Sequence, residues 1–306
     1  MSKRIFISGG AGYIGYALCR DLLHNIPDTH ITVYDNLSRK NFAFFTSDKL
    51  DSPRIKFING DILDNYTLEK TLADIDIILH LAAKVSAPDS DRDSHYYDQV
   101  NHWGSAILAD AARKADIKHF LYLSSSSVYG STPEPVDETF NPNPNSFYGI
   151  SKLRGEKQVR RLNGRMKTHI LRAGNVYGYN PALRIDTVIN KFMFEAHFKN
   201  QILINGDGNQ VRSFIHVDKL VALIRHLVTT EMPSGIYNAV EHKWAVNELV
   251  EHVRELYPDL EYLSLNQNIK MRHVNIKTPC LLQEKFPYQD LNIKSELEAF
   301  KNSFAF

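Results

Sequence analysis

Short apolar runs alternate with longer amphipathic stretches along the first half of this chain. The runs are rich in Ile, Val and Phe, lack polar alternation at their centres, and cover residues 4–8, 30–35, 55–59, 75–81 and 119–124. Such runs are typical of strands buried on both faces of a parallel sheet. Helical stretches lie between them, at residues 13–25, 65–72, 96–114 and 147–162. This order predicts right-handed crossovers and a Rossmann-type, doubly wound parallel α/β fold.

The alternation weakens after residue 175. We expect helices at residues 185–198, 217–229 and 246–257, and short strands at residues 202–204, 236–240 and 261–265. The chain is therefore divided into a Rossmann core, residues 1–175, and a smaller C-terminal α/β lobe, residues 176–306. Residues 206–240 are expected to return partly to the core.

Composition excludes several classes of protein. The formal net charge of +1 over 306 residues gives no global field for nucleic acid or an anionic membrane. Two distant cysteines, Cys19 and Cys280, make neither a disulfide framework nor a metal cluster, so no metal is expected. Residues 1–10 lack a secretory signal, and no run reaches the length of a membrane span. We expect a cytoplasmic protein with no nucleic-acid or membrane partner.

A glycine-rich turn separates the first predicted strand from the first predicted helix. Gly9, Gly12 and Gly15 satisfy G-x-x-G-x-x-G, and Gly10 with the last two satisfies G-x-G-x-x-G. Glycines permit a tight turn and a close approach to a pyrophosphate, which the free N–H groups of the helix N-terminus then bind. The turn predicts a dinucleotide site.

Acidic residues at the ends of the next two predicted strands bear on which dinucleotide binds. Asp35 lies 20 residues after Gly15, where a carboxylate accepts hydrogen bonds from ribose hydroxyls and favours NAD. Arg39 and Lys40 follow and could accept a 2′-phosphate, so NADP stays open. Asp61 is either a second cofactor contact, to the adenine amino group, or a plain turn residue.

Tyr148 and Lys152 are four residues apart in a predicted helix, so their side chains share one face. A nearby ammonium stabilises a phenolate and lowers the tyrosine pKa, which makes the tyrosine a usable acid or base near neutral pH. Downstream of a dinucleotide turn, the pair predicts a catalytic site rather than a surface contact.

Six motifs follow one another in an order typical of one enzyme family. After the glycine turn come "HLAA" (80–83), "SSSSVYG" (124–130), "YGISK" (148–152), "LRAGNVYG" (171–178) and "GDGNQVRSFIHVDKL" (206–220). The chain resembles extended short-chain dehydrogenases/reductases of the NAD-dependent nucleotide-sugar epimerase and dehydratase branch, such as UDP-glucose 4-epimerases. The resemblance covers about residues 4–240 and implies an NAD-binding core and a nucleotide-diphosphate-sugar substrate.

The resemblance also implies roles for individual residues. Ser125 would hydrogen-bond the reacting sugar oxygen, Tyr148 would exchange its proton, and Lys152 would hold the nicotinamide ribose. The implied cofactor contacts are Gly9, Gly12, Tyr13, Ile14, Gly15, Asp35, Asn36, Asp61, Ile62, Leu81, Ala82, Ala83, Asn101, Tyr148, Lys152 and Val176. The implied substrate contacts are Lys84, Ser125, Ser126, Tyr148, Asn175, Arg212 and Arg272. For Arg272 a solvated surface charge is an equal alternative. Asn205 replaces an aromatic residue common near the base, so the base stays open.

The residues after Ser125 bear on the type of reaction. Family 4,6-dehydratases carry Asp-Glu there, and decarboxylases keep the Glu, whereas this chain has Ser126 and Ser127. A hydroxyl is a poor acid or base for eliminating water, and neither cysteine is placed to act instead. A 4-epimerase working through a transient 4-keto sugar is therefore expected. A 4-ketosugar reductase on the same residues and a non-catalytic NAD(H)-sensing protein are the alternatives. The resemblance further implies a homodimer, formed through a four-helix bundle of residues 96–114 and 147–162.

Overall fold

The computed structural model describes residues 3–85, 90, 92–265, 273–286 and 292–304. Its main element is a seven-stranded sheet in the order β11-β7-β5-β4-β1-β2-β3, in which every pairing is parallel. The strands are β1 (Lys3–Ser8), β2 (Thr29–Asp35), β3 (Ile55–Asn59), β4 (Ile77–His80), β5 (His119–Ser125), β7 (Lys167–Ala173) and β11 (Gly235–Ala239). The predicted doubly wound α/β fold is confirmed.

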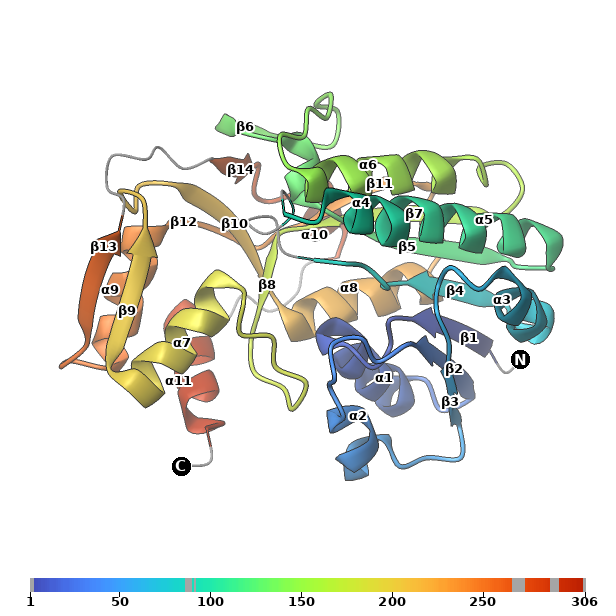
Figure 1. Cartoon of the computed structure of the whole chain (residues 1–306), viewed down its shortest axis with the longest axis horizontal. Coiled ribbons are helices and arrows are strands. Elements are labelled where there is room, and N and C mark those ends of the chain that lie inside the picture. The colour runs from blue at the N-terminus through green and yellow to red at the C-terminus, as the bar shows by residue number, and fades with distance from the viewer. Residues whose placement is uncertain (1–2, 86–89, 91, 266–272, 287–291, 305–306) are drawn as a thin grey trace.

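The sheet is covered by helices on both faces (Figure 1). One face carries α1 (Tyr13–Asn25) and α8 (Val217–Thr229), and the other carries α3 (Asn65–Thr71), α5 (Gly104–Lys114) and α6 (Phe147–Arg160). The strand sequences explain this arrangement. In β1, Ile5 and Ile7 pack in one core and Phe6 packs in the other, all fully buried. A central strand without polar alternation thus fills two cores at once.

The structure differs from the sequence-based predictions at several elements, of which one helix start and one central strand bear on the site. The helix expected over residues 96–114 begins earlier, as α4 (Ser94–Tyr97), and continues through a π-helical turn (Asp98–Trp103, η3) into α5. Strand β7 was not predicted, because its buried positions include polar side chains such as Thr168, His169 and Arg172. His169 and Arg172 have hydrogen-bonding partners in other parts of the chain, namely His119, Pro233 and Glu156, so the apolar pattern of a buried strand is interrupted here.

Short connecting elements lie at the edges of the core. They are α2 (Ala43–Thr46), the 3₁₀ turns η1 (Asp48–Leu50), η2 (Leu72–Asp74) and η4 (Ser126–Tyr129), and the parallel pair β6 (Thr132–Val136) with β14 (Val274–Ile276). The last of the turns, η4, directly follows β5 and holds the end of the serine run. Because η4 follows the C-terminal end of β5, the serine run lies at the carboxyl edge of the sheet.

The rest of the chain forms a smaller α/β part with its own core. It contains the three-stranded sheet β12-β10-β8 and the parallel pair β13-β9. The elements are β8 (Asn175–Tyr177), α7 (Val188–Lys199), β9 (Gln201–Asn205), β10 (Val211–His216), β12 (His242–Ala245), α9 (Val246–Leu256), β13 (Glu261–Leu265) and α11 (Ile293–Asn302). Helix α10 (Leu281–Lys285) packs against β11 instead, and its Leu282 belongs to the core of the large sheet. Between these segments the chain returns to the large sheet as α8 and β11, the latter paired with β7. None of the described helices has the length and apolarity needed to cross a lipid bilayer.

Candidate active site

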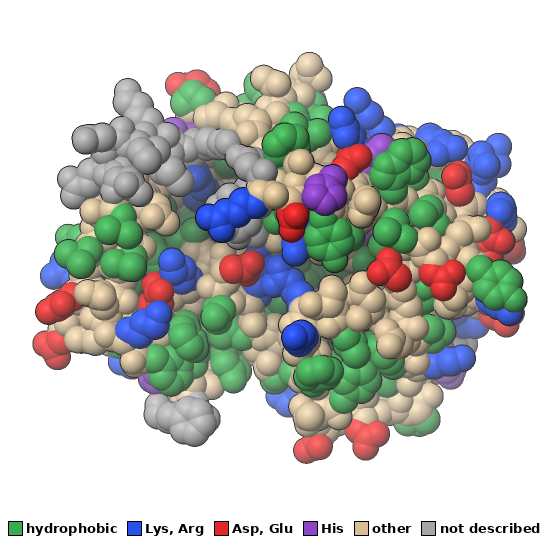
Figure 2. All heavy atoms as spheres, viewed as in Figure 1, with side chains coloured by type: hydrophobic (Ala, Val, Ile, Leu, Met, Phe, Trp, Pro, Cys, Tyr) green, Lys and Arg blue, Asp and Glu red, His purple; other side chains and the backbone are tan. Residues whose placement is uncertain are grey.

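A cavity of about 800 Å³ opens at the carboxyl edge of the parallel sheet. Ligands of doubly wound folds bind at this edge, where the loops leaving neighbouring strands diverge. Figure 2 shows a hollow near the middle of the molecular face, with basic and acidic side chains gathered around it. Most of the predicted cofactor contacts line the cavity, namely Gly9, Gly12, Tyr13, Ile14, Gly15, Asp35, Asn36, Asp61, Ile62, Leu81, Ala82 and Ala83.

The glycine turn forms the floor of this cavity and is too tight for side chains. Gly9 has a φ of +73°, and a Cβ there would lie 2.7 Å from the backbone nitrogen of Ala82. A Cβ on Gly15 would lie 2.5 Å from the Gly9 carbonyl oxygen. Helix α1 then begins at Tyr13 with Gly12 as its N-cap, without a side-chain cap and without an acidic residue in its first turn. The positive end of the helix is thus left for an anion, which fits a dinucleotide pyrophosphate.

The two acidic residues predicted from the sequence lie on the cavity wall. Asp35 accepts hydrogen bonds from the backbone N–H groups of Ala11 (3.1 Å) and Leu37 (2.8 Å), and its burial raises the pKa of the carboxyl. Asp61 accepts from the Asn36 side chain (2.9 Å) and from a backbone N–H of its own turn. Each carboxylate is held by these bonds and keeps acceptor capacity for ribose or adenine groups.

The loop after β2 adds cationic residues to the same wall. Arg39 and Lys40 line the cavity beside Asp35. Arg39 also forms an ion pair with Asp186 (3.6 Å), which in turn pairs with Arg184 from the loop after β8. The cationic side chains that left NADP open in the sequence therefore do face the cofactor cavity.

The serine run and the Tyr-Lys pair meet where β5 ends and α6 begins. Ser125 is the last residue of β5, and its Oγ accepts a hydrogen bond from the N–H of Ser127 (3.2 Å). A Cβ on Gly149 would lie 2.5 Å from the carbonyl oxygen of Ser127, so the first turn of α6 approaches η4 closely. Tyr148 is half-buried in that turn. Ser125, Tyr148 and Lys152 are thus brought together by tertiary contacts between two elements.

The protonation of Tyr148 differs from the sequence-based expectation. Burial raises the pKa of Tyr148, and the Ser125 hydroxyl, followed by Arg184 and Arg39, opposes this effect. The Nζ of Lys152 lies 4.2 Å from the centre of the Tyr122 ring, a neighbour that the sequence did not indicate. Burial lowers the pKa of Lys152 to about 7, although Glu156 opposes the shift. The net direction for Tyr148 in the free protein is therefore upward.

Asn101 does not line the cavity, but its side chain joins two of the segments that surround it. It is fully buried in the π-helical turn η3, and its Oδ1 accepts the N–H of Lys84 (2.8 Å). Its Nδ2 donates to the Lys84 carbonyl (2.9 Å) and to the Ser151 hydroxyl (2.9 Å), which itself donates to the carbonyl of Tyr148 (2.8 Å). Asn101 thereby links the segment after β4, whose Lys84 lines the cavity, to the first turn of α6.

The remaining predicted substrate contacts come from the strands of the smaller part. Asn175 in β8 donates to the carbonyl of Ser213 (3.2 Å), and Val176 beside it is buried. Arg212 lies in the neighbouring strand β10, and its guanidinium donates to the Val211 carbonyl (3.1 Å). Ser126 is buried in η4. Arg272 lies outside the residues that the structure describes.

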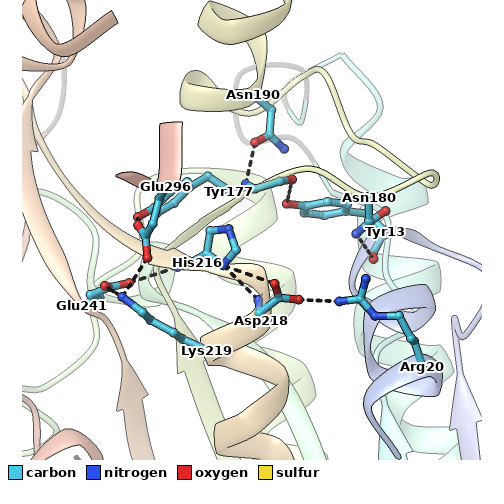
Figure 3. Close-up of polar contacts among 11 residues, drawn as sticks. Tyr13, Arg20, Tyr177, Asn180, Asn190, His216, Asp218, Lys219, Glu241 and Glu296 are labelled. Atoms are coloured by element: carbon cyan, nitrogen blue, oxygen red, sulfur yellow. Dashed lines mark hydrogen bonds and ion pairs between the residues drawn. The ribbon is translucent and has the colours of Figure 1, made fainter. Parts of the chain in front are cut away.

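The loop after β8 lines the cavity with Pro181, Ala182, Leu183 and Arg184, none of which was predicted. Figure 3 shows how this loop is held. The Tyr13 hydroxyl donates to the carbonyl of Gly178 (2.6 Å), and the Asn180 side chain donates to the Tyr13 carbonyl (3.1 Å). The Asn190 side chain accepts the N–H of Gly178 (3.0 Å). The only sequence signal for this loop was its position after the "LRAGNVYG" motif.

A buried polar cluster lies deeper in the smaller part (Figure 3). The Lys219 ammonium pairs with the carboxylates of Glu241 and, at 2.9 Å, Glu296, and the Tyr177 hydroxyl donates to Glu296. Glu241, Glu296 and His242 have ligand atoms within 4.8 Å of one another. A cation of the chain itself already lies between the two carboxylates, so this group joins α8, α11 and β8 without requiring a metal.

Comparison with known proteins now identifies the family. The model of the NAD dependent epimerase/dehydratase family matches residues 5–239. The chain belongs to this family. The resemblance inferred from the six motifs is thereby confirmed, together with the nicotinamide cofactor type that the glycine turn and Asp35 indicate.

Individual relatives of this family carry out more than one reaction. The chain is 32% identical to a putative UDP-glucose 4-epimerase of Methanocaldococcus jannaschii, over 82% of this chain and 81% of that protein. It is 28% identical to the dTDP-D-glucose 4,6-dehydratase of Mus musculus, over 99% and 90% respectively. Its structure matches a UDP-N-acetylglucosamine 4-epimerase from Methanobrevibacter ruminantium M1 with a TM-score of 0.87, at 26% identity and 99% and 98% coverage. The chain is thus similar to both epimerases and dehydratases.

Proposed function

We propose that this protein is an NAD-dependent nucleotide-sugar 4-epimerase. The observation that carries the proposal is the grouping of Ser125, Tyr148 and Lys152 at the carboxyl edge of the sheet. The two residues directly after Ser125 are serines and not carboxylic acids. A 4-epimerase needs one group that moves a proton at the sugar hydroxyl and one that polarises the same oxygen. It needs no further acid or base at the neighbouring carbons.

Each residue of the group has a distinct role in this proposal. Tyr148 takes the proton from the C4 hydroxyl of the sugar and later returns it to the C4 oxygen. Ser125 hydrogen-bonds that oxygen, and Lys152 places a positive charge beside the phenol and the ribose. NAD, when bound by the glycine turn and Asp35, supplies the hydride acceptor and donor. After the 4-keto sugar turns over in the site, return of the hydride to the opposite face of C4 and of the proton from Tyr148 to the C4 oxygen would give the epimer.

The residues after Ser125 favour epimerisation over elimination of water. Ser126 is buried and Ser127 is half-buried in η4, and neither offers a carboxylate. Eliminating water from the sugar requires an acid for the leaving hydroxyl and a base for a carbon-bound proton, and a serine hydroxyl is too weak for both at neutral pH. We therefore propose that this chain does not eliminate water from the sugar, as the dehydratases among its relatives do.

The substrate we propose is a nucleotide-diphosphate sugar. Asn175 and Arg212, on the adjacent strands β8 and β10, would contact the diphosphate, for which a guanidinium fork is well suited. Lys84 and Ser126 would contact the sugar side. The base is left open, since Asn205 stands where relatives often place an aromatic residue.

We further propose a cytoplasmic homodimer. Trp103 in η3 and Phe147 at the start of α6 are 56% and 45% exposed, and these two elements pack against each other. Large exposed aromatic side chains on one helical layer favour burial against a second copy. A four-helix bundle made from this layer of two subunits would cover them.

A 4-ketosugar reductase on the same three residues is the second candidate. The observation that favours it is the position of Arg39 and Lys40 on the cavity wall beside Asp35, where they could bind a 2′-phosphate. Such an enzyme would consume NADPH from solution rather than retain NAD. A non-catalytic NAD(H) sensor is disfavoured by the presence of both Tyr148 and Lys152.

The test begins with the cofactor that copurifies with the protein, identified by absorbance and mass spectrometry. UDP-, dTDP-, GDP- and CDP-sugars are then screened with and without added NAD(P)H. Interconversion of a C4 epimer pair without added cofactor supports the epimerase. Strict dependence on NADPH and a keto sugar would assign the reductase instead, and bound NAD without turnover would assign the sensor.

Replacement of the catalytic tyrosine tests the mechanism. We expect Tyr148→Phe to lose about 10²–10⁴-fold in turnover, the usual contribution of a general acid–base group, while it retains bound NAD. Tyr66→Phe is the matched control, because Tyr66 is 68% exposed and lies outside the site. Full turnover by Tyr148→Phe would show that the mechanism is wrong.

A further inference from the structure

The ammonium of Lys152 is buried against an aromatic ring. Lys152 is only 2% exposed, and its Nζ lies 4.2 Å from the centre of the Tyr122 ring in β5. Burial of an ammonium favours loss of its proton, because the charged form gives up its hydration. The negative face of an aromatic ring returns part of that stabilisation, and more so in a desolvated site.

The packing around Tyr122 holds its ring in this place. Tyr122 is fully buried, and its hydroxyl donates to the backbone carbonyl of Lys152 (3.5 Å). Gly155 lies one turn further along α6, where a Cβ would be 2.4 Å from the Tyr122 hydroxyl. The glycine therefore lets α6 approach β5 closely enough for the ring to reach the ammonium.

The nearest acidic residue on the same helix is already engaged elsewhere. Glu156 follows Lys152 by four residues, so the two share a face of α6. Its Oε1 accepts from the Ser124 hydroxyl (2.6 Å) and from Nε of Arg172 (2.9 Å), and its Oε2 accepts from Nη2 of Arg172 (2.8 Å). With that carboxylate neutralised by Arg172, the ring face of Tyr122 becomes the group in direct contact with the ammonium.

We propose that Tyr122 is a positioning residue, whose ring face keeps Lys152 protonated and fixed beside the catalytic tyrosine. The significance for catalysis rests on the proposed function, because Lys152 must carry its charge to assist Tyr148. The contact itself does not depend on that function. It therefore makes predictions for the free protein as well as for the enzyme.

The other titratable groups that face Lys152 do not replace this contact. His80 in β4 packs against the Tyr122 ring, with ring centres 5.2 Å apart. Its burial, together with the charge of Lys152, lowers the pKa of His80 to about 3, so the imidazole stays neutral near pH 7. Burial raises the pKa of Tyr122 and of Tyr148, so neither phenol carries a charge near pH 7 in the protein without cofactor and substrate. Among the described residues, the charged groups on this side are Glu156 with its partners Arg172 and Arg160.

The experiment measures the titration of Lys152 directly. Lysine side chains are labelled with ¹³C at Cε, the Lys152 signal is assigned by its loss in Lys152→Met, and its pH midpoint is followed by NMR in the free protein. We expect a midpoint below the ordinary value of a lysine, because burial lowers the pKa of Lys152, but above the midpoint of a protein without the ring face at position 122. Tyr122→Phe keeps the ring face, so its midpoint should stay within about 0.3 units, whereas Tyr122→Leu should lower it by roughly one unit.

A second substitution covers the case in which the leucine variant fails to fold. Pentafluorophenylalanine incorporated at position 122 keeps the shape of phenylalanine but withdraws charge from the ring face, so it should lower the midpoint relative to Tyr122→Phe. Equal midpoints for the phenylalanine and pentafluorophenylalanine proteins would overturn the proposal.

The pH dependence of turnover supplies the link to function. The high-pH limb of kcat/KM should move to lower pH in the same variants and by the same amount as the NMR midpoint, because the rate falls when Lys152 loses its proton. A shifted midpoint without any sugar turnover would refute the proposed function and leave the positioning role standing. A shifted midpoint with an unshifted rate limb would refute the catalytic significance of the contact.

Discussion

The ion pair beneath the serine run offers a quantitative test of the structure that does not depend on function. Arg172 and Glu156 are 1% and 0% exposed at the side chain, and two hydrogen bonds of 2.9 and 2.8 Å join them. The Ser124 hydroxyl donates to the same carboxylate (2.6 Å). Arg172→Met would remove this cation and keep a side chain of comparable length over the Tyr129 ring. The buried carboxylate would retain the Ser124 hydrogen bond and the half-exposed Arg160 at 3.8 Å.

The expected cost follows from the burial of both charges. Removing one partner of a buried ion pair costs about 3–5 kcal/mol of unfolding free energy, because the other charge remains desolvated. A domain has about 5–15 kcal/mol in total, so the single variant should lose a large share of its free energy of unfolding. Glu156→Gln should be destabilised similarly, since it leaves the buried guanidinium without its counter-charge.

The double variant separates charge imbalance from loss of packing. Glu156→Gln combined with Arg172→Met removes both charges, while the glutamine oxygen can still accept the Ser124 hydrogen bond. We expect a double-variant cost well below the sum of the single costs, with a coupling of about 2–3 kcal/mol. Urea denaturation of all four proteins, followed by far-UV circular dichroism, measures these free energies. Single costs below about 1 kcal/mol, or costs that simply add, would refute the reasoning.

Two further predictions concern the cofactor turn and acid stability. Gly15→Ala would place a Cβ 2.5 Å from the Gly9 carbonyl oxygen. The NAD affinity, measured by calorimetry, should therefore fall at least tenfold (~1.4 kcal/mol). Gly235→Ala is the control and should bind NAD normally, because a Cβ there meets its nearest atom at 3.6 Å. Burial lowers the pKa of both His80 and His119 to about 3, so the unfolded chain takes up these protons first and stability is lost as pH falls from about 6.5 toward 3. Each imidazole should cost roughly 2 kcal/mol at pH 5. Histidine NMR titrations with midpoints near 6.5 would contradict this.

Much of the cofactor site could be predicted from the sequence because its parts are local. The glycine turn, the strand before it and the helix after it are contiguous, and Asp35 ends the very next strand. Backbone conformation and helix N-terminal charge depend on near neighbours, so these features are visible without a structure. The loop at residues 181–184 was missed because it is held at the cavity by residues distant in the sequence, among them Tyr13, which contacts Gly178 and Asn180.

The sequence by itself determined the doubly wound fold, the dinucleotide turn and the Tyr148–Lys152 pair, since each depends on periodicity or short-range spacing, whereas Ser125 was indicated by the resemblance to the family. Only the tertiary structure decided how burial and neighbours shift the pKa values of Tyr148 and Lys152. The spacing of Tyr148 and Lys152 predicted a lowered tyrosine pKa, yet burial raises it, and the Lys152 ammonium lies over the ring of Tyr122 from another strand. Desolvation and ring contacts are set by what packs around a side chain, and those neighbours are distant in the sequence.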